Sequence, residues 1–76
     1  MNAYLDEQVR RLGTGGAPDI GPLSTGERAY IALSAQRYEL LPAMYTDPIE
    51  AWYRLGPAWR RAVCGWRGWP VEWSDG

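Results

Sequence analysis

Glycine and proline divide this 76-residue chain into short segments, and this division limits what it can fold into. Residues 13–23 contain four glycines and two prolines, a density that predicts a linker and excludes a regular element. Pro42 closes the next segment, and Gly56-Pro57 divides the one after it. The length is that of one small domain, so we expect a single domain over residues 1–76 in which 13–23 joins two elements.

The first two segments carry helical signals. In residues 2–12 the apolar side chains recur at i, i+4 and i+7, with Asn2 as the expected N-cap and Gly13 as the expected stop (Leu5, Val9, Leu12). The second segment begins with Ser24 and Glu27 at capping-box spacing and is expected to run from Glu27 to about Leu41. Its wide apolar surface, which includes Tyr38, predicts a central helix contacted on more than one side.

Two further short helices are predicted around the Gly56-Pro57 break. Asp47 followed by Pro48 is typical of a helix start, and apolar residues then recur at i, i+3, i+4 and i+7 (Ile49, Trp52, Tyr53, Gly56). The next helix is expected from Pro57 to Cys64 or Trp66, with Trp59, Ala62 and Val63 on its apolar face.

The C-terminal tail has a different pattern. Trp69, Val71 and Trp73 alternate with Pro70 and Glu72, a period of two that predicts an extended segment. We therefore predict an all-α fold, a small bundle of about four short helices covered by an extended, Trp-rich C-terminal strap.

The composition argues against catalysis. The chain has no histidine and no lysine, which removes the usual general base, the commonest metal ligand and the Schiff-base nucleophile. The single cysteine, Cys64, has no histidine to activate it and is expected to be a small buried apolar residue. We predict a protein that is not an enzyme, with no catalytic residues, no metal site and no cofactor.

No apolar run approaches the roughly 20 residues that a membrane span needs. Residues 1–7 lack the basic and apolar regions of a secretion signal, and one thiol suits a reducing compartment. The expected location is the cytoplasm, without membrane attachment.

The surplus of large aromatic rings indicates a binding surface. Five tryptophans and five tyrosines are more than so small a bundle can enclose completely, because each ring has a polar tip. Residues 48–67 also carry four arginines against one glutamate, a net +3. Arg, Trp and Tyr are enriched at protein–protein hot spots, whereas the tryptophans on helical stripes are expected to be mainly core. The predicted partner-binding set is Arg60, Arg61, Arg67, Trp69 and Trp73.

Two other functions remain open. The two short helices around Gly56-Pro57, with Arg60 and Arg61, resemble the outline of a helix-turn-helix nucleic-acid-binding regulator. Against that interpretation, the isoelectric point is about 5.2, whereas such domains usually lie above about 9. A structural or assembly subunit is the other alternative.

Two stretches support a resemblance to a known class of proteins. Residues 24–33 (STGERAYIAL) and 47–55 (DPIEAWYRL) resemble small accessory proteins of phages and mobile elements, of the anti-CRISPR kind. Such proteins bind a host defence complex and block it. The resemblance implies a phage-encoded inhibitor or adaptor that occludes a host protein in the host cytoplasm, and it assigns no role to any individual residue.

Overall fold

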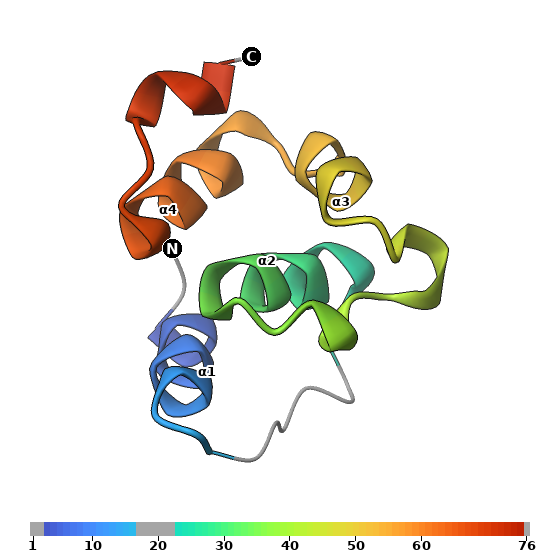
Figure 1. The fold of residues 1–76 in the computed structure, drawn as a ribbon, viewed down its shortest axis with the longest axis vertical. Helices are drawn as coiled ribbons and strands as arrows, with labels where there is room; N and C mark the ends of the chain where they lie inside the picture. Colours follow the sequence, from blue (N-terminus) through green and yellow to red (C-terminus); the bar gives the residue numbers. More distant parts are fainter. Residues whose placement is uncertain (1–2, 17–22, 76) are drawn as a thin grey trace.

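The computed structural model describes residues 3–16 and 23–75, and every regular element within these ranges is a helix (Figure 1). The predicted all-α class is confirmed. The predicted N-cap Asn2 and most of the linker, residues 17–22, lie outside the described residues. The α-helices are α1 (Ala3–Gly13), α2 (Thr25–Ala35), α3 (Pro48–Arg54) and α4 (Pro57–Arg67), and the 3-10 helices are η1 (Tyr38–Leu40), η2 (Ala43–Tyr45) and η3 (Val71–Asp75).

Helix α2 is the centre of the bundle. It contacts α1, α3, α4 and η1, and these elements surround it in Figure 1. Six consecutive α2 residues, 29–34, are buried, as expected for a helix that is covered on all sides. The capping box between Ser24 and Glu27 is present at its start, with both reciprocal hydrogen bonds formed. The central position predicted from the sequence is therefore confirmed.

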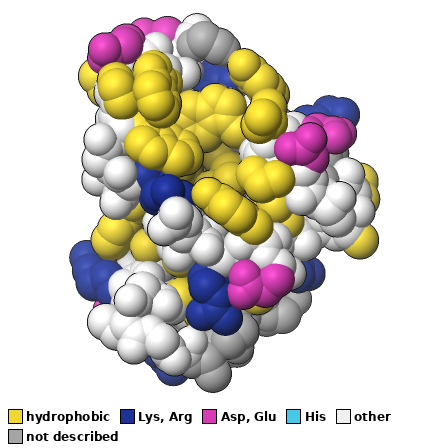
Figure 2. All heavy atoms as spheres, viewed as in Figure 1, with side chains coloured by type: hydrophobic (Ala, Val, Ile, Leu, Met, Phe, Trp, Pro, Cys, Tyr) yellow, Lys and Arg dark blue, Asp and Glu magenta, His cyan; other side chains and the backbone are white. Residues whose placement is uncertain are grey.

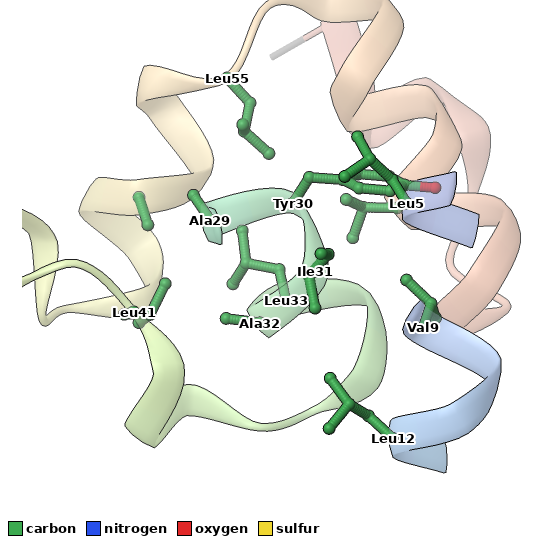
Figure 3. Close-up of a cluster of buried hydrophobic side chains, with 12 residues drawn as sticks. Leu5, Val9, Leu12, Ala29, Tyr30, Ile31, Ala32, Leu33, Leu41 and Leu55 are labelled. Atoms are coloured by element: carbon green, nitrogen blue, oxygen red, sulfur yellow. The ribbon is translucent and has the colours of Figure 1, made fainter. Parts of the chain in front are cut away.

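The core gathers around α2 (Figure 3). Helix α1 contributes the predicted stripe of Leu5, Val9 and Leu12. The other buried side chains come from α2, from the end of η1, from α3 and its C-cap, and from α4 (Ala29, Tyr30, Ile31, Ala32, Leu33, Leu41, Ala51, Leu55, Val63). Among the described residues, no helix is long and apolar enough to cross a lipid bilayer.

The end of α1 differs from the prediction by two residues. Gly13 lies inside the helix, and the left-handed residue that ends it is Gly15, with φ of +87°. The Gly16 N–H donates to the Arg11 carbonyl at 2.7 Å and the Gly15 N–H donates to the Leu12 carbonyl at 3.1 Å. These bonds close the Schellman motif, which satisfies the last carbonyls of the helix.

The predicted end of the second helix near Leu41 is wrong. Helix α2 stops at Ala35, because Gln36 adopts a left-handed conformation with φ of +61° and the Arg37 N–H donates to the Ala32 carbonyl at 2.9 Å. The chain then reverses through η1. This reversal buries Leu41 and leaves Tyr38 exposed, whereas a continuous helix would have placed both on one stripe.

The C-terminal tail is not an extended strap. After a left-handed turn at Gly68, residues 71–75 form η3, which packs against α4. The Trp73 N–H donates to the Pro70 carbonyl at 3.1 Å, and the buried Ser74 hydroxyl donates to the Val71 carbonyl at 2.7 Å. An extended segment would have needed a neighbouring strand for its backbone hydrogen bonds, and the described residues contain no strand. The backbone groups of the tail form local hydrogen bonds instead.

A chain of polar contacts joins α1, α2 and α4. The indole N–H of Trp66 donates to the Tyr30 hydroxyl at 2.6 Å, and that hydroxyl donates to the Asp6 carboxylate at 2.8 Å. Burial and the bond to Asp6 raise the pKa of Tyr30 to about 12. Trp59 packs edge-on against the Tyr30 ring, with centroids 5.2 Å apart. Trp59 and Trp66 therefore have clear roles in holding the bundle together.

Candidate functional site

An apolar groove of about 630 Å³ lies between α3 and η3. Figure 2 shows hydrophobic side chains gathered around a hollow in the region where α3, α4 and η3 meet in Figure 1. The groove is lined by five aromatic rings, three aliphatic or proline side chains and one acid (Leu33, Tyr38, Pro48, Ile49, Trp52, Tyr53, Trp69, Glu72, Trp73). Concave, mainly apolar surfaces with few polar groups are the usual form of binding sites.

Helix α3 forms one wall because it presents its larger side chains to solvent. Asp47 caps the helix by accepting a hydrogen bond from the Ile49 N–H at 2.9 Å. From that start, Ala51 and Leu55 face the core, one turn apart. Ile49 and Tyr53, also one turn apart, are 67% and 62% exposed. The helical spacing of Ile49 and Tyr53 therefore marks a face that is exposed to solvent.

Three tryptophans connect this wall to the C-terminal wall. The Trp52 and Trp69 rings meet edge-to-face with centroids 5.7 Å apart, and the Trp69 and Trp73 centroids are 5.8 Å apart. Trp52 and Trp69 are half-buried, while Trp73 is 52% exposed. The series therefore runs from the core edge to the surface, and its inner rings support the outer one.

Arg67 holds the base of the groove together. Its Nη1 atom donates to the Leu33 carbonyl at 3.3 Å and to the Tyr38 hydroxyl at 3.1 Å, and its guanidinium lies 4.6 Å from the Trp69 ring centroid. These contacts join α4 to α2 and η1 and fix the Trp69 ring. Rings that are fixed in this way lose little conformational entropy when a partner binds.

The groove has little charge. Glu72 is the single charged side chain among its lining residues. Behind it, Cys64 is buried, as predicted, and burial raises the pKa of its thiol, with a further increase from the negative charge of Glu72. Within the described ranges, no three His, Cys, Asp or Glu side chains lie close enough together to hold a metal ion. The chemistry of this site is therefore that of apolar and aromatic contact.

The structure separates the five residues of the predicted partner-binding set. Trp69 and Trp73 line the groove. Arg67 lies at its base and is already engaged by protein groups. Arg60 is half-buried and Arg61 is exposed, and both lie on α4 outside the groove lining. The surplus of indole is real, since Trp66 and Trp73 are both classed as exposed.

The other half of the groove lies outside the predicted partner-binding set. Ile49 and Tyr53 show only helical spacing in the sequence, and a helix continued to Leu41 would place Tyr38 on its apolar stripe. Pro48 and Glu72 had been interpreted only as a helix start and as part of the alternating tail. One feature of the sequence does indicate the exposed face. Ala51 and Leu55 are four residues apart and form a second helical stripe with smaller side chains.

Comparison of this chain with known protein families, with curated proteins and with solved structures gave no match.

Proposed function

We propose that this protein is a non-catalytic binding protein whose aromatic groove takes an apolar segment of a partner protein. It would act as an inhibitor or adaptor by covering the surface to which that segment belongs. The observation that carries the proposal is the exposed groove between α3 and η3, where Ile49, Tyr53 and Trp73 remain more than half exposed.

The composition of the groove favours a protein partner. Trp and Tyr combine a large contact area with few rotatable bonds, and they dominate hot spots at protein interfaces. A fixed apolar surface in the isolated protein is the state expected of a site prepared for association. The bracing of Trp69 by Arg67 supports the same conclusion, because it fixes the groove before a partner arrives.

The partner class follows from the resemblance to small phage accessory proteins. On that basis the partner would be a component of a host defence complex, met in the host cytoplasm. Binding there would be stoichiometric and would need no cofactor.

A capture experiment with matched variants tests this function. The wild-type protein, a Tyr53→Ser/Trp73→Ser double variant and a Met44→Ser control would each be immobilised and exposed to a bacterial lysate. Met44 is 70% exposed on η2 and lies outside the groove lining, so its replacement removes exposed apolar surface without touching the groove. We expect the wild type and the control to retain the same protein and the double variant to lose it.

Three results would contradict the proposal. Equal capture by all three proteins would remove the groove from the interface. Recovery of nucleic acid that disappears steeply with added salt would instead favour the alternative regulator, because phosphate contacts weaken strongly as salt rises. Sedimentation of the wild type as a dimer that the double variant cannot form would assign the groove to self-assembly.

A further inference from the structure

The side-chain groups around the groove are rich in hydrogen-bond donors. Indole N–H groups only donate, and Trp52, Trp69 and Trp73 bring one each. Among residues 3–16 and 23–75, no acceptor receives a hydrogen bond from these three nitrogens, in contrast to Trp66, which donates to Tyr30. The nitrogens of the half-buried Trp52 and Trp69 retain access to solvent. A ligand that covers them must therefore supply acceptors.

This requirement distinguishes between the conformations that a bound segment could have. An α-helix uses its backbone carbonyls internally, so only polar side chains on its apolar face could accept from the indole N–H groups. A β-strand needs a sheet edge, and the described residues contain no strand that could provide one. A polyproline II segment has no internal hydrogen bonds, and its carbonyls remain available.

A ligand for this groove should also carry few hydrogen-bond donors, and a proline-rich segment meets this condition. Among the side chains that line the groove, only the Glu72 carboxylate and the Tyr38 and Tyr53 hydroxyls can accept hydrogen bonds, so a chain with many backbone N–H groups would find few acceptors there. Proline has no N–H, and its ring packs on flat aromatic faces. The segment is also ordered before it binds, which reduces the entropy cost of association.

The charge of the groove indicates what flanks such a segment. Glu72 and Trp73 both line the groove, so a ligand that covers the Trp73 ring can bring a neighbouring residue close to the carboxylate. No described side chain forms an ion pair with Glu72, whereas Glu7 and Glu39 each have an arginine partner. A basic residue beside the apolar segment would complete the site.

We infer that the groove between α3 and η3 recognises a proline-rich segment in the polyproline II conformation, with an arginine or lysine next to Glu72. This inference rests on the proposed function and specifies the partner's binding motif. The indole groups of Trp52, Trp69 and Trp73 would donate to its carbonyls, and Ile49 and Tyr53 would pack against its rings.

Titration with synthetic peptides tests the inference directly. The first peptide is proline- and leucine-rich, about nine residues or roughly three polyproline II turns long, with one terminal arginine. The second has glutamate in place of that arginine, and the third is an amphipathic helical peptide with the same charge as the first. Nitrogen–proton NMR spectra of the full chain would follow the indole signals during each titration. We expect the arginine peptide to bind best and to shift the indole signals of Trp52, Trp69 and Trp73 while Trp59 changes least.

Two pairs of variants on the same element sharpen the result. Glu72→Gln should weaken binding of the arginine peptide about two- to fivefold, whereas Asp75→Asn, an exposed acid outside the groove lining, should not. Trp73→Ala should weaken binding at least about fivefold, whereas Val71→Ala, also exposed on η3, should leave it unchanged. If Trp73→Ala does not fold by circular dichroism, Tyr53→Ala on the opposite wall takes its place.

The outcomes separate this inference from the proposed function. If the helical peptide binds in a Trp73-dependent way and the proline-rich peptide does not, the polyproline inference is overturned while the groove remains a binding site. Equal binding of the arginine and glutamate peptides would overturn the role of Glu72. Binding of no peptide, together with a lysate capture that is insensitive to the groove substitutions, would overturn both.

Discussion

Replacing Tyr30 by phenylalanine tests the polar contact that joins three helices. The substitution keeps the ring, which is completely buried against Trp59, and removes only the hydroxyl. That hydroxyl donates to the Asp6 carboxylate at 2.8 Å and accepts from the Trp66 indole at 2.6 Å. A hydrogen bond to a charged group contributes about 1.5–3 kcal/mol, and the half-exposed Trp66 can recover a water partner. We therefore expect a loss of about 2 kcal/mol in the free energy of unfolding.

Thermal unfolding followed by circular dichroism measures this loss. For a domain of this size about 1 kcal/mol corresponds to 4–8 °C in Tm, so Tyr30→Phe should lower Tm by about 8–16 °C. Tyr53→Phe is the matched control, because Tyr53 is exposed and its hydroxyl has no hydrogen-bond partner among the described residues. A Tm for Tyr30→Phe that stays within the change caused by the control would show that the three-helix contact does not stabilise the fold.

Two further predictions concern stability. The folded protein keeps the Tyr30 proton with a pKa of about 12, against 10.0 for an ordinary tyrosine, so the stabilisation is fully present below pH 10 and is lost as the pH rises through about 12. Urea unfolding at a series of alkaline pH values should show this decline in the wild type, and an equally steep decline in Tyr30→Phe would contradict it. Gln36→Gly should raise the free energy of unfolding by about 0.5–1 kcal/mol, because glycine adopts the left-handed conformation at φ +61° without steric cost. Gln36→Ala is its control in the same assay, and a gain in stability from alanine equal to that from glycine would contradict the steric explanation.

The helix starts could be predicted because their signals are local. The Ser24–Glu27 capping box and Asp47 before Pro48 act within three residues of the chain, so the sequence contains the whole interaction. The same holds for the α1 stripe, since one face of a short amphipathic helix has only one core to meet.

The helix ends were predicted less well because one of them has no sequence signal. Three of the helices finish on a left-handed residue, and at Gly15 and Gly68 a glycine makes that conformation inexpensive. At Gln36 an ordinary side chain adopts it, and packing of η1 and Leu41 against α2 compensates for the cost. The prediction of an extended tail is wrong because the spacing of its tryptophans is ambiguous. Trp69 and Trp73 are four residues apart, a spacing that fits a helical turn as well as an alternating strand.

The groove could not be predicted because hydrophobicity alone selects the wrong face of α3. Ile49 and Tyr53 have more apolar surface than Ala51 and Leu55, so a ranking by hydrophobicity places the larger pair in the core. The structure buries the smaller pair where α3 packs against α2, and of the rings on α3 only Trp52 packs partly against the core. The larger pair is then left opposite Trp73, where burying it would require a second molecule. Helix α3 gives its smaller face to its own core and its larger face to the groove, and this arrangement is the observation that supports the proposed binding function.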